Sequence, residues 1–179
     1  YAEALIILDG RTITGVGGGV CQVSTTLFRA AFFSGFPIVE RHAHAYRVSY
    51  YEKVAGNRID QNLAGLDATV FVPLVDFKFT NDSPNWLLME TYVSPTYSSI
   101  TWKFYSTSDG RQVEWETTGP VNIVPAPEPE YKEKPELEKG DIEQVDWPAD
   151  GADVTVNRTV RRDGNVYFTD TFRTHYLPW

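Results

Sequence analysis

The stretch GGGVCQVSTTLF, residues 17–28, decides how the first half of the chain is organised. Three glycines lead directly into Cys21, the only cysteine among 179 residues. Neither Gly nor Pro occurs in residues 21–34, and a glycine follows at position 35. Apolar residues recur in this segment at helical spacing, at Val23, Leu27 and Ala31. The pattern predicts a helix that begins at Cys21 and ends before Gly35.

A cysteine at the start of a helix has surroundings that favour the thiolate, which is the reactive form. The first helical turn offers backbone N–H groups without partners and the positive end of the helix dipole. No capping Ser, Thr, Asp or Asn directly precedes Cys21, so we expect its sulfur to lie near the amides of residues 22–24. The same amides would stabilise an oxyanion during acyl transfer. Glycines 17–19, including Gly19, would let a substrate approach the sulfur.

A nucleophilic cysteine also needs a general base, and histidine titrates closest to neutral pH. His42 and His44 lie in IVERHAHAYRVSYY, residues 38–51, whose alternation predicts a strand with both imidazoles on one face. The residues alone do not choose between the two, and His175 in the tail is a poorer candidate. Candidate carboxylates to orient the imidazole are Glu40, Asp67 and Asp76. Candidate cations to hold a substrate carboxylate are Arg41, Arg47 and Lys78.

Other interpretations of these residues compete with catalysis. A lone cysteine is often a small buried apolar residue. Two histidines at positions i and i+2 can bind a metal ion, but no third ligand is evident in the sequence. The GVGGG run lacks the lysine of a phosphate-binding P-loop and the GxGxxG pattern. The aromatic residues of segment 86–115 are expected in the core, although exposed members would stack on sugar rings.

Composition excludes several classes of protein. The net charge is −8 and the longest basic run is Arg161-Arg162, so nucleic acid is not an expected partner. No segment approaches the roughly 18 apolar residues that a membrane span needs. A single cysteine excludes an internal disulfide framework and a cysteine-based zinc cage. The chain begins at Tyr1 without Met or a signal-like segment, and we expect it to be a fragment of a longer protein.

The rest of the chain has mostly β patterning. A strand is expected at 4–8 with a turn at 9–12, and irregular structure at 52–66. SDG at 108–110 and RDGN at 162–165 predict hairpin turns, and 125–140, with four prolines and five glutamates, predicts an extended linker. Further strands are expected at 68–80, interrupted at Pro73, and at 86–93, 99–106 and 111–118. The predicted fold class is α+β: a helix carrying Cys21 packed on a mostly antiparallel sheet, followed by a small all-β appendage.

The long segment GVGGGVCQVSTTLFRAAFFSGFPIVERHAHAYRVSY, with GLDATV (65–70) and DFKFTNDSP (76–84), resembles the VanW family, a bacterial cell-envelope family named from glycopeptide-resistance gene clusters. The resemblance covers roughly residues 3–95. The end of the chain, from GADVTV to YLPW, is similar to the small G5-like β module that follows such domains. The resemblance therefore implies a VanW-like domain at 1–124, a linker at 125–140 and a G5-like module at 141–179.

The resemblance also implies an extracellular, envelope-associated protein that acts on peptidoglycan stem peptides as an L,D-transpeptidase without a cofactor. Carried over by position, Cys21 is the acylated nucleophile, and His42 or His44 is the base. Where the family commonly has Pro between the two histidines this chain has Ala43, and the stretch before GLDATV is longer than usual. Alternatives are a cysteine peptidase or carboxypeptidase on wall peptides and a non-catalytic peptidoglycan-binding module. The expected substrate-binding or oxyanion residues are Gly19, Gln22, Ser24, Thr25 and Arg41.

Overall fold

The computed structural model describes residues 3–8, 11–54, 56 and 58–179. The strand expected near the N-terminus is present as β1 (Glu3–Leu8), which pairs with β2 (Arg11–Val16). The turn expected at 9–12 falls partly outside the described residues.

The predicted helix is confirmed as α1 (Val20–Phe33), the single α-helix among the described residues. Its N-cap is Gly19, whose φ of 87° places this residue in the left-handed region that favours glycine. At its other end, Gly35 donates its N–H to Phe32 O and Phe36 donates to Ala31 O, with Gly35 at a φ of 75°. This pair of hydrogen bonds is a Schellman motif, which explains why the helix stops where the sequence changes.

The predicted α+β fold class, a helix packed on one mostly antiparallel sheet, is wrong. About 40% of the chain is in strands and 13% is helical, and the strands form several small antiparallel sheets. The largest sheet has four strands, in which β11 pairs with β9, β10 and β12. Irregular segments and short 3-10 helices, η1 (Ser49–Glu52) and η3 (Gln61–Leu63), divide the N-terminal half of the chain. The remaining strands are β3 (Ile38–Glu40), β4 (Lys53–Val54), β5 (Arg58–Ile59), β6 (Lys78–Phe79), β7 (Leu88–Ser94), β8 (Ser99–Tyr105), β9 (Arg111–Thr117), β10 (Val121–Val124), β11 (Gly151–Arg162) and β12 (Asn165–Tyr176).

Two local predictions are also wrong, because distant pairing overrides the local pattern. The strand expected over 38–51 ends as β3 at Glu40, and after an isolated bridge between His42 and Thr69 the chain becomes irregular. The hairpin expected around 108–110 does not form, because β8 pairs with β7 whereas β9 pairs with β11. The C-terminal hairpin of β11 and β12 is confirmed, and 125–140 contains no strand.

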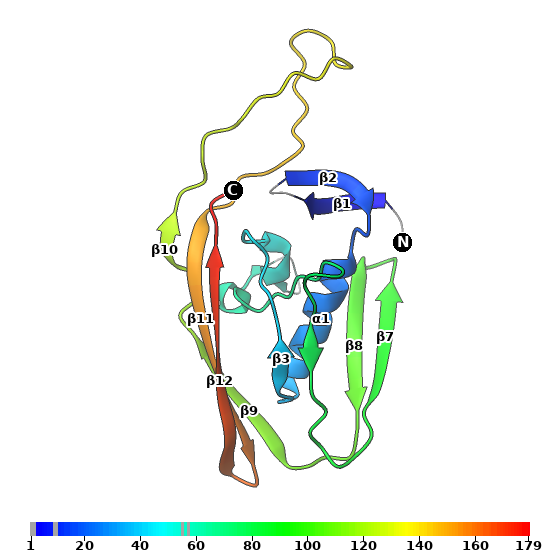
Figure 1. Cartoon of the computed structure of the whole chain (residues 1–179), viewed down its shortest axis with the longest axis vertical. Coiled ribbons are helices and arrows are strands. Elements are labelled where there is room, and N and C mark those ends of the chain that lie inside the picture. Colours follow the sequence, from blue (N-terminus) through cyan, green and yellow to red (C-terminus); the bar gives the residue numbers. More distant parts are fainter. Residues whose placement is uncertain (1–2, 9–10, 55, 57) are drawn as a thin grey trace.

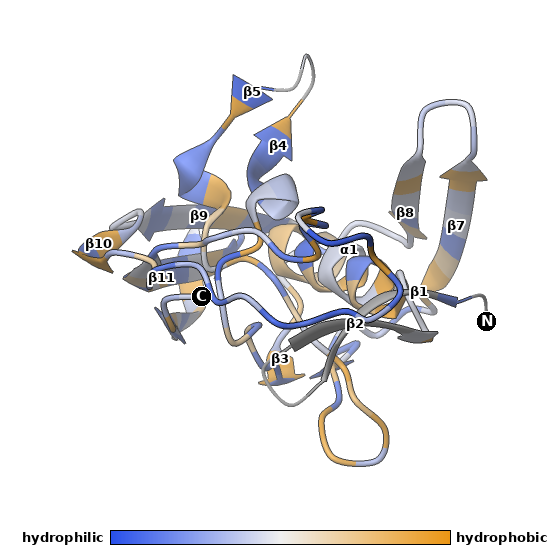
Figure 2. Cartoon of the chain, turned by 90° about the horizontal axis from the view of Figure 1, so that it is seen from above, coloured by the Kyte–Doolittle hydropathy of each residue, from blue (hydrophilic) through white to orange (hydrophobic). Residues whose placement is uncertain are grey.

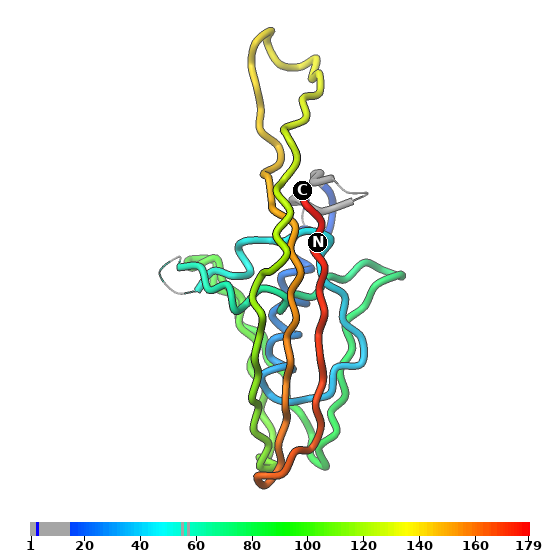
Figure 3. Tube along the Cα trace, turned by 90° about the vertical axis from the view of Figure 1, so that its left-hand side faces the viewer, coloured from blue at the N-terminus to red at the C-terminus, as the bar shows by residue number. Residues whose placement is uncertain are grey.

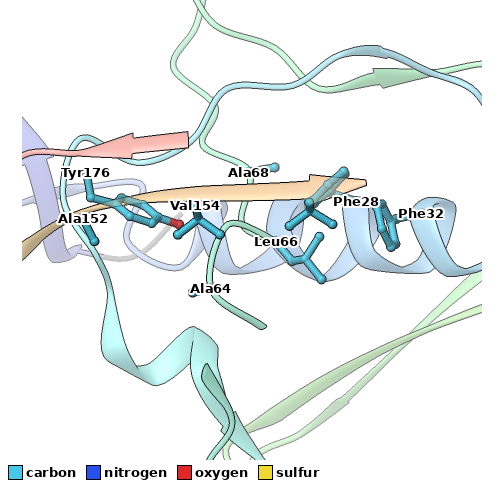
Figure 4. Packing of buried hydrophobic residues seen from close by; sticks show 9 residues of the cluster. Phe28, Phe32, Ala64, Leu66, Ala68, Ala152, Val154 and Tyr176 are labelled. Atoms are coloured by element: carbon cyan, nitrogen blue, oxygen red, sulfur yellow. The ribbon is translucent and has the colours of Figure 1, made fainter. Parts of the chain in front are cut away.

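Helix α1 lies between the four-stranded sheet and the β7–β8 hairpin (Figure 1), and it occupies the middle of the molecule when seen from above (Figure 2). The buried core joins the helix to the C-terminal hairpin and to the segment before β6 (Figure 4). Arg158 of β11 is fully buried and donates to the carbonyls of Phe32 and Phe36, which ties the helix end to the sheet. The core cluster comprises Phe28, Phe32, Ala64, Leu66, Ala68, Ala152, Val154, Val156 and Tyr176.

The C-terminal strands and the first part of the chain thus share one core. Strands β9, β11 and β12 run side by side, and the segment between β10 and β11 projects beyond them (Figure 3). The predicted domain limits, 1–124, 125–140 and 141–179, stay a prediction. No helix in the described part of the chain has the length and apolar character to span a membrane.

Candidate active site

Cys21 is the second residue of α1, and its side chain is only partly buried. Its Sγ lies 3.3 Å from Oγ1 of Thr69 and 3.7 Å from the carbonyl oxygen of Val70. Thr69 is held in place by its own N–H, which donates to the carbonyl of His42 at 2.9 Å. The helix start therefore faces the segment that follows Asp67.

Ser24 and Thr25 fix the helix to this segment. Ser24 Oγ donates to the carbonyl oxygen of Ala68 at 2.5 Å. Thr25 Oγ1 donates to the same oxygen at 3.1 Å and accepts the Ala68 N–H at 3.0 Å. Both residues are buried, and these hydrogen bonds join the start of α1 to the segment that carries Thr69. Their expected role toward a substrate stays a prediction.

The imidazole of His44 lies between Cys21 and Asp67. Its Nδ1 is 2.6 Å from Asp67 Oδ2, and the backbone N–H of His44 donates to the same oxygen at 2.7 Å. On its other side the imidazole acts on the thiol of Cys21, whose pKa it lowers. A thiol, an imidazole and a carboxylate thus follow one another, which is the order of groups used in acyl transfer through cysteine.

The opposite oxygen of Asp67 is held by two further side chains. Arg41 Nη2 lies 3.1 Å from Oδ1, and the hydroxyl of Tyr176 donates to Oδ1 at 2.5 Å. The Asp67 side chain is 5% exposed, so these contacts replace the water that would otherwise solvate the carboxylate.

The site favours a thiolate beside an imidazolium. Burial raises the pKa of Cys21, but hydrogen bonds to His44 and Thr69 outweigh it and bring the pKa from 9.0 to about 7. Burial lowers the pKa of His44, but its contacts with Asp67 and Cys21 raise the pKa from 6.5 to about 9. Burial raises the pKa of Asp67, but the His44 hydrogen bond and the Arg41 charge bring it to about 2. At neutral pH the three groups therefore approach the charges −, + and −.

The sequence predicts that the backbone N–H groups of residues 22–24 lie near the sulfur, and the first-turn N–H groups make different contacts. The N–H groups of Gln22 and Val23 both donate to the carbonyl of Gly19, each at 3.1 Å, because the left-handed Gly19 turns that carbonyl toward the helix. The N–H of Cys21 itself has no backbone acceptor among the described contacts. It is consequently the first-turn amide most available to an oxyanion.

Among the described residues, the other candidates make no hydrogen bond with the sulfur. The ring of His42, half exposed, contacts Glu40 at 3.3 Å, and that of His175 contacts Asp153 at 2.6 Å. Gln22 is exposed, next to Cys21 in the helix. Arg41 is buried and donates to four internal acceptors: the backbone oxygens of Asp67 and Gly65, Asp67 Oδ1 and Thr174 Oγ1. Arg47 pairs with Glu52, and Lys78 pairs with Glu40 and Asp76.

Two residues of the site were not identified from the sequence. Thr69 contacts the sulfur, and the only available signal was its place in the GLDATV segment, next to one of the three candidate carboxylates. Tyr176 reaches Asp67 across 109 positions of sequence, and no local pattern marks it. In the described part of the chain, no three His, Cys, Asp or Glu side chains gather as metal ligands would.

The two glycines before the helix do not pack against other described residues. A Cβ added at Gly17 or Gly19 would meet no atom within 4 Å. Two surface cavities lie along β8, lined by residues that include Phe33 and Phe104, and neither includes Cys21.

The match to a known protein family covers the part of the chain that contains Cys21, His44 and Asp67. The family model described as "VanW like protein" matches residues 1–105. Over 81 residues the chain is 42% identical to "Uncharacterized protein YoaR" of Bacillus subtilis, which covers 45% of this chain and 23% of that protein. Over 83 residues it is 30% identical to "Vancomycin B-type resistance protein VanW" of Enterococcus faecalis, covering 46% of this chain and 28% of that protein. The chain thus spans about a quarter of the length of these relatives. No solved structure matches it with comparable significance.

Proposed function

The chain belongs to the VanW family, and on that premise we propose that it is a cysteine acyl-transferase of the L,D-transpeptidase type acting on peptidoglycan stem peptides. The observation that carries the proposal is the row Cys21, His44 and Asp67, in which the pKa of the thiol falls to about 7. A thiol kept only as a packing residue needs neither an imidazole nor a buried carboxylate behind it.

In the first step the thiolate of Cys21 attacks the carbonyl carbon of an L,D peptide bond and forms a C–S bond. The backbone N–H of Cys21 faces the oxyanion that develops. As the C–N bond breaks, protonated His44 gives its proton to the leaving amino group of the terminal D-residue. Asp67 holds the imidazole in orientation and stabilises its positive charge until the proton leaves.

In the second step a side-chain amine of a neighbouring stem attacks the thioester carbonyl. Neutral His44 takes the proton that this amine loses, and the C–S bond breaks to restore the thiolate. The product is a new amide cross-link. Water in place of the amine would release a trimmed stem peptide, which is the carboxypeptidase alternative.

The proposed chemistry is argued from contacts in the structure. The proposed substrate class is argued mainly from the relatives of this chain. One relative's name associates it with vancomycin resistance, and the family resemblance implies work on the cell wall. The space around Gly17 and Gly19, just before Cys21, leaves room for a polymer chain beside the helix start, and an envelope location follows from the family resemblance. Acylation of a thiol needs no cofactor, because His44 supplies and removes the proton.

The test uses the full chain with muropeptides that carry tetrapeptide stems, followed by mass analysis of the products. The expected result is a thioester adduct on Cys21 and cross-linked dimers that the Cys21→Ala variant does not form. Trimmed stems without dimers would identify the carboxypeptidase alternative and contradict transfer. Retention of muropeptide binding with neither adduct nor product would identify a binding module and contradict catalysis.

A further inference from the structure

The carboxylate of Asp67 is held from a part of the chain outside the family match. That match ends at residue 105, whereas Tyr176 is the last residue of β12. The phenol is 3% exposed and points inward along the core, toward the segment that carries Leu66 (Figure 4). The part of the chain that matches the family model therefore does not by itself contain every contact of the site.

The direction of the Tyr176 hydrogen bond is determined by a second contact. Its oxygen accepts the backbone N–H of Gly65 at 3.0 Å, so the hydroxyl hydrogen remains for Asp67 Oδ1. Asp67 Oδ2 receives both donors of His44, and Oδ1 receives Tyr176 and Arg41. Each carboxylate oxygen thus has two donors, which prevents the group from rotating away from the imidazole.

The end of the chain fixes the histidine segment as well. Thr174 Oγ1 accepts from Arg41 Nη1 at 2.9 Å, and the N–H of Leu177 donates to the carbonyl of Ala45 at 2.8 Å. Residue 45 directly follows His44, so the backbone on the C-terminal side of the base is paired with the residue after Tyr176. One short stretch of chain thus contacts Asp67, Arg41 and the backbone next to His44.

We propose that Tyr176 is a positioning residue of the active site, and that the end of β12 completes the site by orienting Asp67 toward His44. The catalytic meaning of this role rests on the proposed function. Tyr176 acts through His44 and not through contact with the substrate. A fragment that ends with the family match would lack this support.

The test measures the Cys21 thiol in the absence of substrate. Because the chain has one cysteine, the pH dependence of its alkylation by iodoacetamide reports Cys21 alone. Tyr176→Phe removes only the hydroxyl. Tyr167→Phe is the matched control on the same strand, where the phenol is 45% exposed and packs on Arg162. The expected result is a rise of about one unit in the thiol pKa for Tyr176→Phe, about fivefold less thiolate at about pH 7, and no change for the control.

Activity gives the second readout. With muropeptide substrate, Tyr176→Phe should lower kcat about tenfold or more and leave KM unchanged, because no substrate contact is lost. An unchanged or lowered thiol pKa in a folded Tyr176→Phe variant would overturn the proposal. If that variant does not fold by circular dichroism, Thr174→Val decides in its place. A raised thiol pKa then supports the proposal and an unchanged one overturns it.

The thiol measurement separates this inference from the proposed function. If the wild-type chain forms no thioester while Tyr176→Phe still shifts the thiol pKa, the acyl-transfer function is wrong and the positioning role stands. If transfer occurs and Tyr176→Phe changes neither thiol pKa nor kcat, the function stands and the positioning role is wrong.

Discussion

Nδ1 of His44 lies 2.6 Å from Oδ2 of Asp67, and the backbone N–H of the same histidine donates to that oxygen. One carboxylate oxygen thereby fixes both the ring and the main chain of the base. The ring also interacts with Cys21, so the position of the imidazole beside the thiol depends on Asp67. The predictions below test this dependence and the contacts around it.

The pH dependence of acyl transfer should follow the Cys21–His44 pair. The thiol ionises with a pKa of about 7 and the imidazolium loses its proton with a pKa of about 9. Activity that needs thiolate and imidazolium should rise as pH increases through about 7 and fall as it increases through about 9. A profile of kcat/KM from pH 5 to pH 10 measures both limbs. A single rise near pH 9 would show an unassisted thiol.

The two histidines should differ sharply on substitution. His44→Ala removes the base and leaves Asp67 facing Cys21 across a gap, so the thiol pKa should return toward 9.0 and kcat should fall at least about 100-fold. His42→Ala removes a half-exposed ring that contacts Glu40, and activity should change by less than about threefold. Initial rates for the two variants measure the contrast. Equal effects would contradict the assignment of His44.

The hydroxyl of Thr69, and not the rest of its side chain, should contribute to the lowered pKa of the Cys21 thiol. Thr69→Val keeps the side-chain shape and removes the group that lies 3.3 Å from Sγ. A hydrogen bond worth about 1 kcal/mol corresponds to a rise in the Cys21 pKa of about 0.7 unit. Alkylation rates against pH measure the change, with Thr26→Val as the control, since its hydroxyl donates to Gln22 O in the same helix. No difference between the two variants would remove Thr69 from the site.

Thr25 should contribute to stability and not to chemistry. Its hydroxyl donates to the carbonyl of Ala68 and accepts the Ala68 N–H, both buried. Thr25→Val leaves that N–H without a partner and should lower the free energy of unfolding by about 1–3 kcal/mol. Urea unfolding measures the loss. An unchanged unfolding midpoint would mean that water or another group replaces the hydroxyl.

Asp67 should make the protein sensitive to acid. Its folded-state pKa of about 2 lies below the ordinary 3.8, so its contribution is complete above about pH 4 and is lost as pH falls through 2. The difference corresponds to about 2 kcal/mol of unfolding free energy. Unfolding of Asp67→Asn at pH 6 and at pH 2 should show a pH dependence smaller by about that amount. An identical dependence in variant and wild type would contradict the buried ion pairs.

Local sequence was sufficient wherever neighbouring residues decide the structure. The absence of Gly and Pro over 21–34, with Gly35 after it, determined a helix that presents Cys21 in its first turn. The RDGN turn between alternating segments determined the β11–β12 hairpin. The VanW resemblance named Cys21 and the histidine pair, because those residues lie within one continuous stretch of sequence, residues 15–50.

Tertiary structure decided which of the candidates meet. The alternation of 38–51 placed His42 and His44 on one face, but the backbone leaves the extended conformation after His42 pairs with Thr69. His44 then turns to Asp67, one of three candidate carboxylates, and Tyr176 approaches from 109 positions away. Sequence spacing fixes side-chain direction only while the backbone is regular. Beyond that point, direction depends on hydrogen bonds to distant segments, and these exist only once the core has formed.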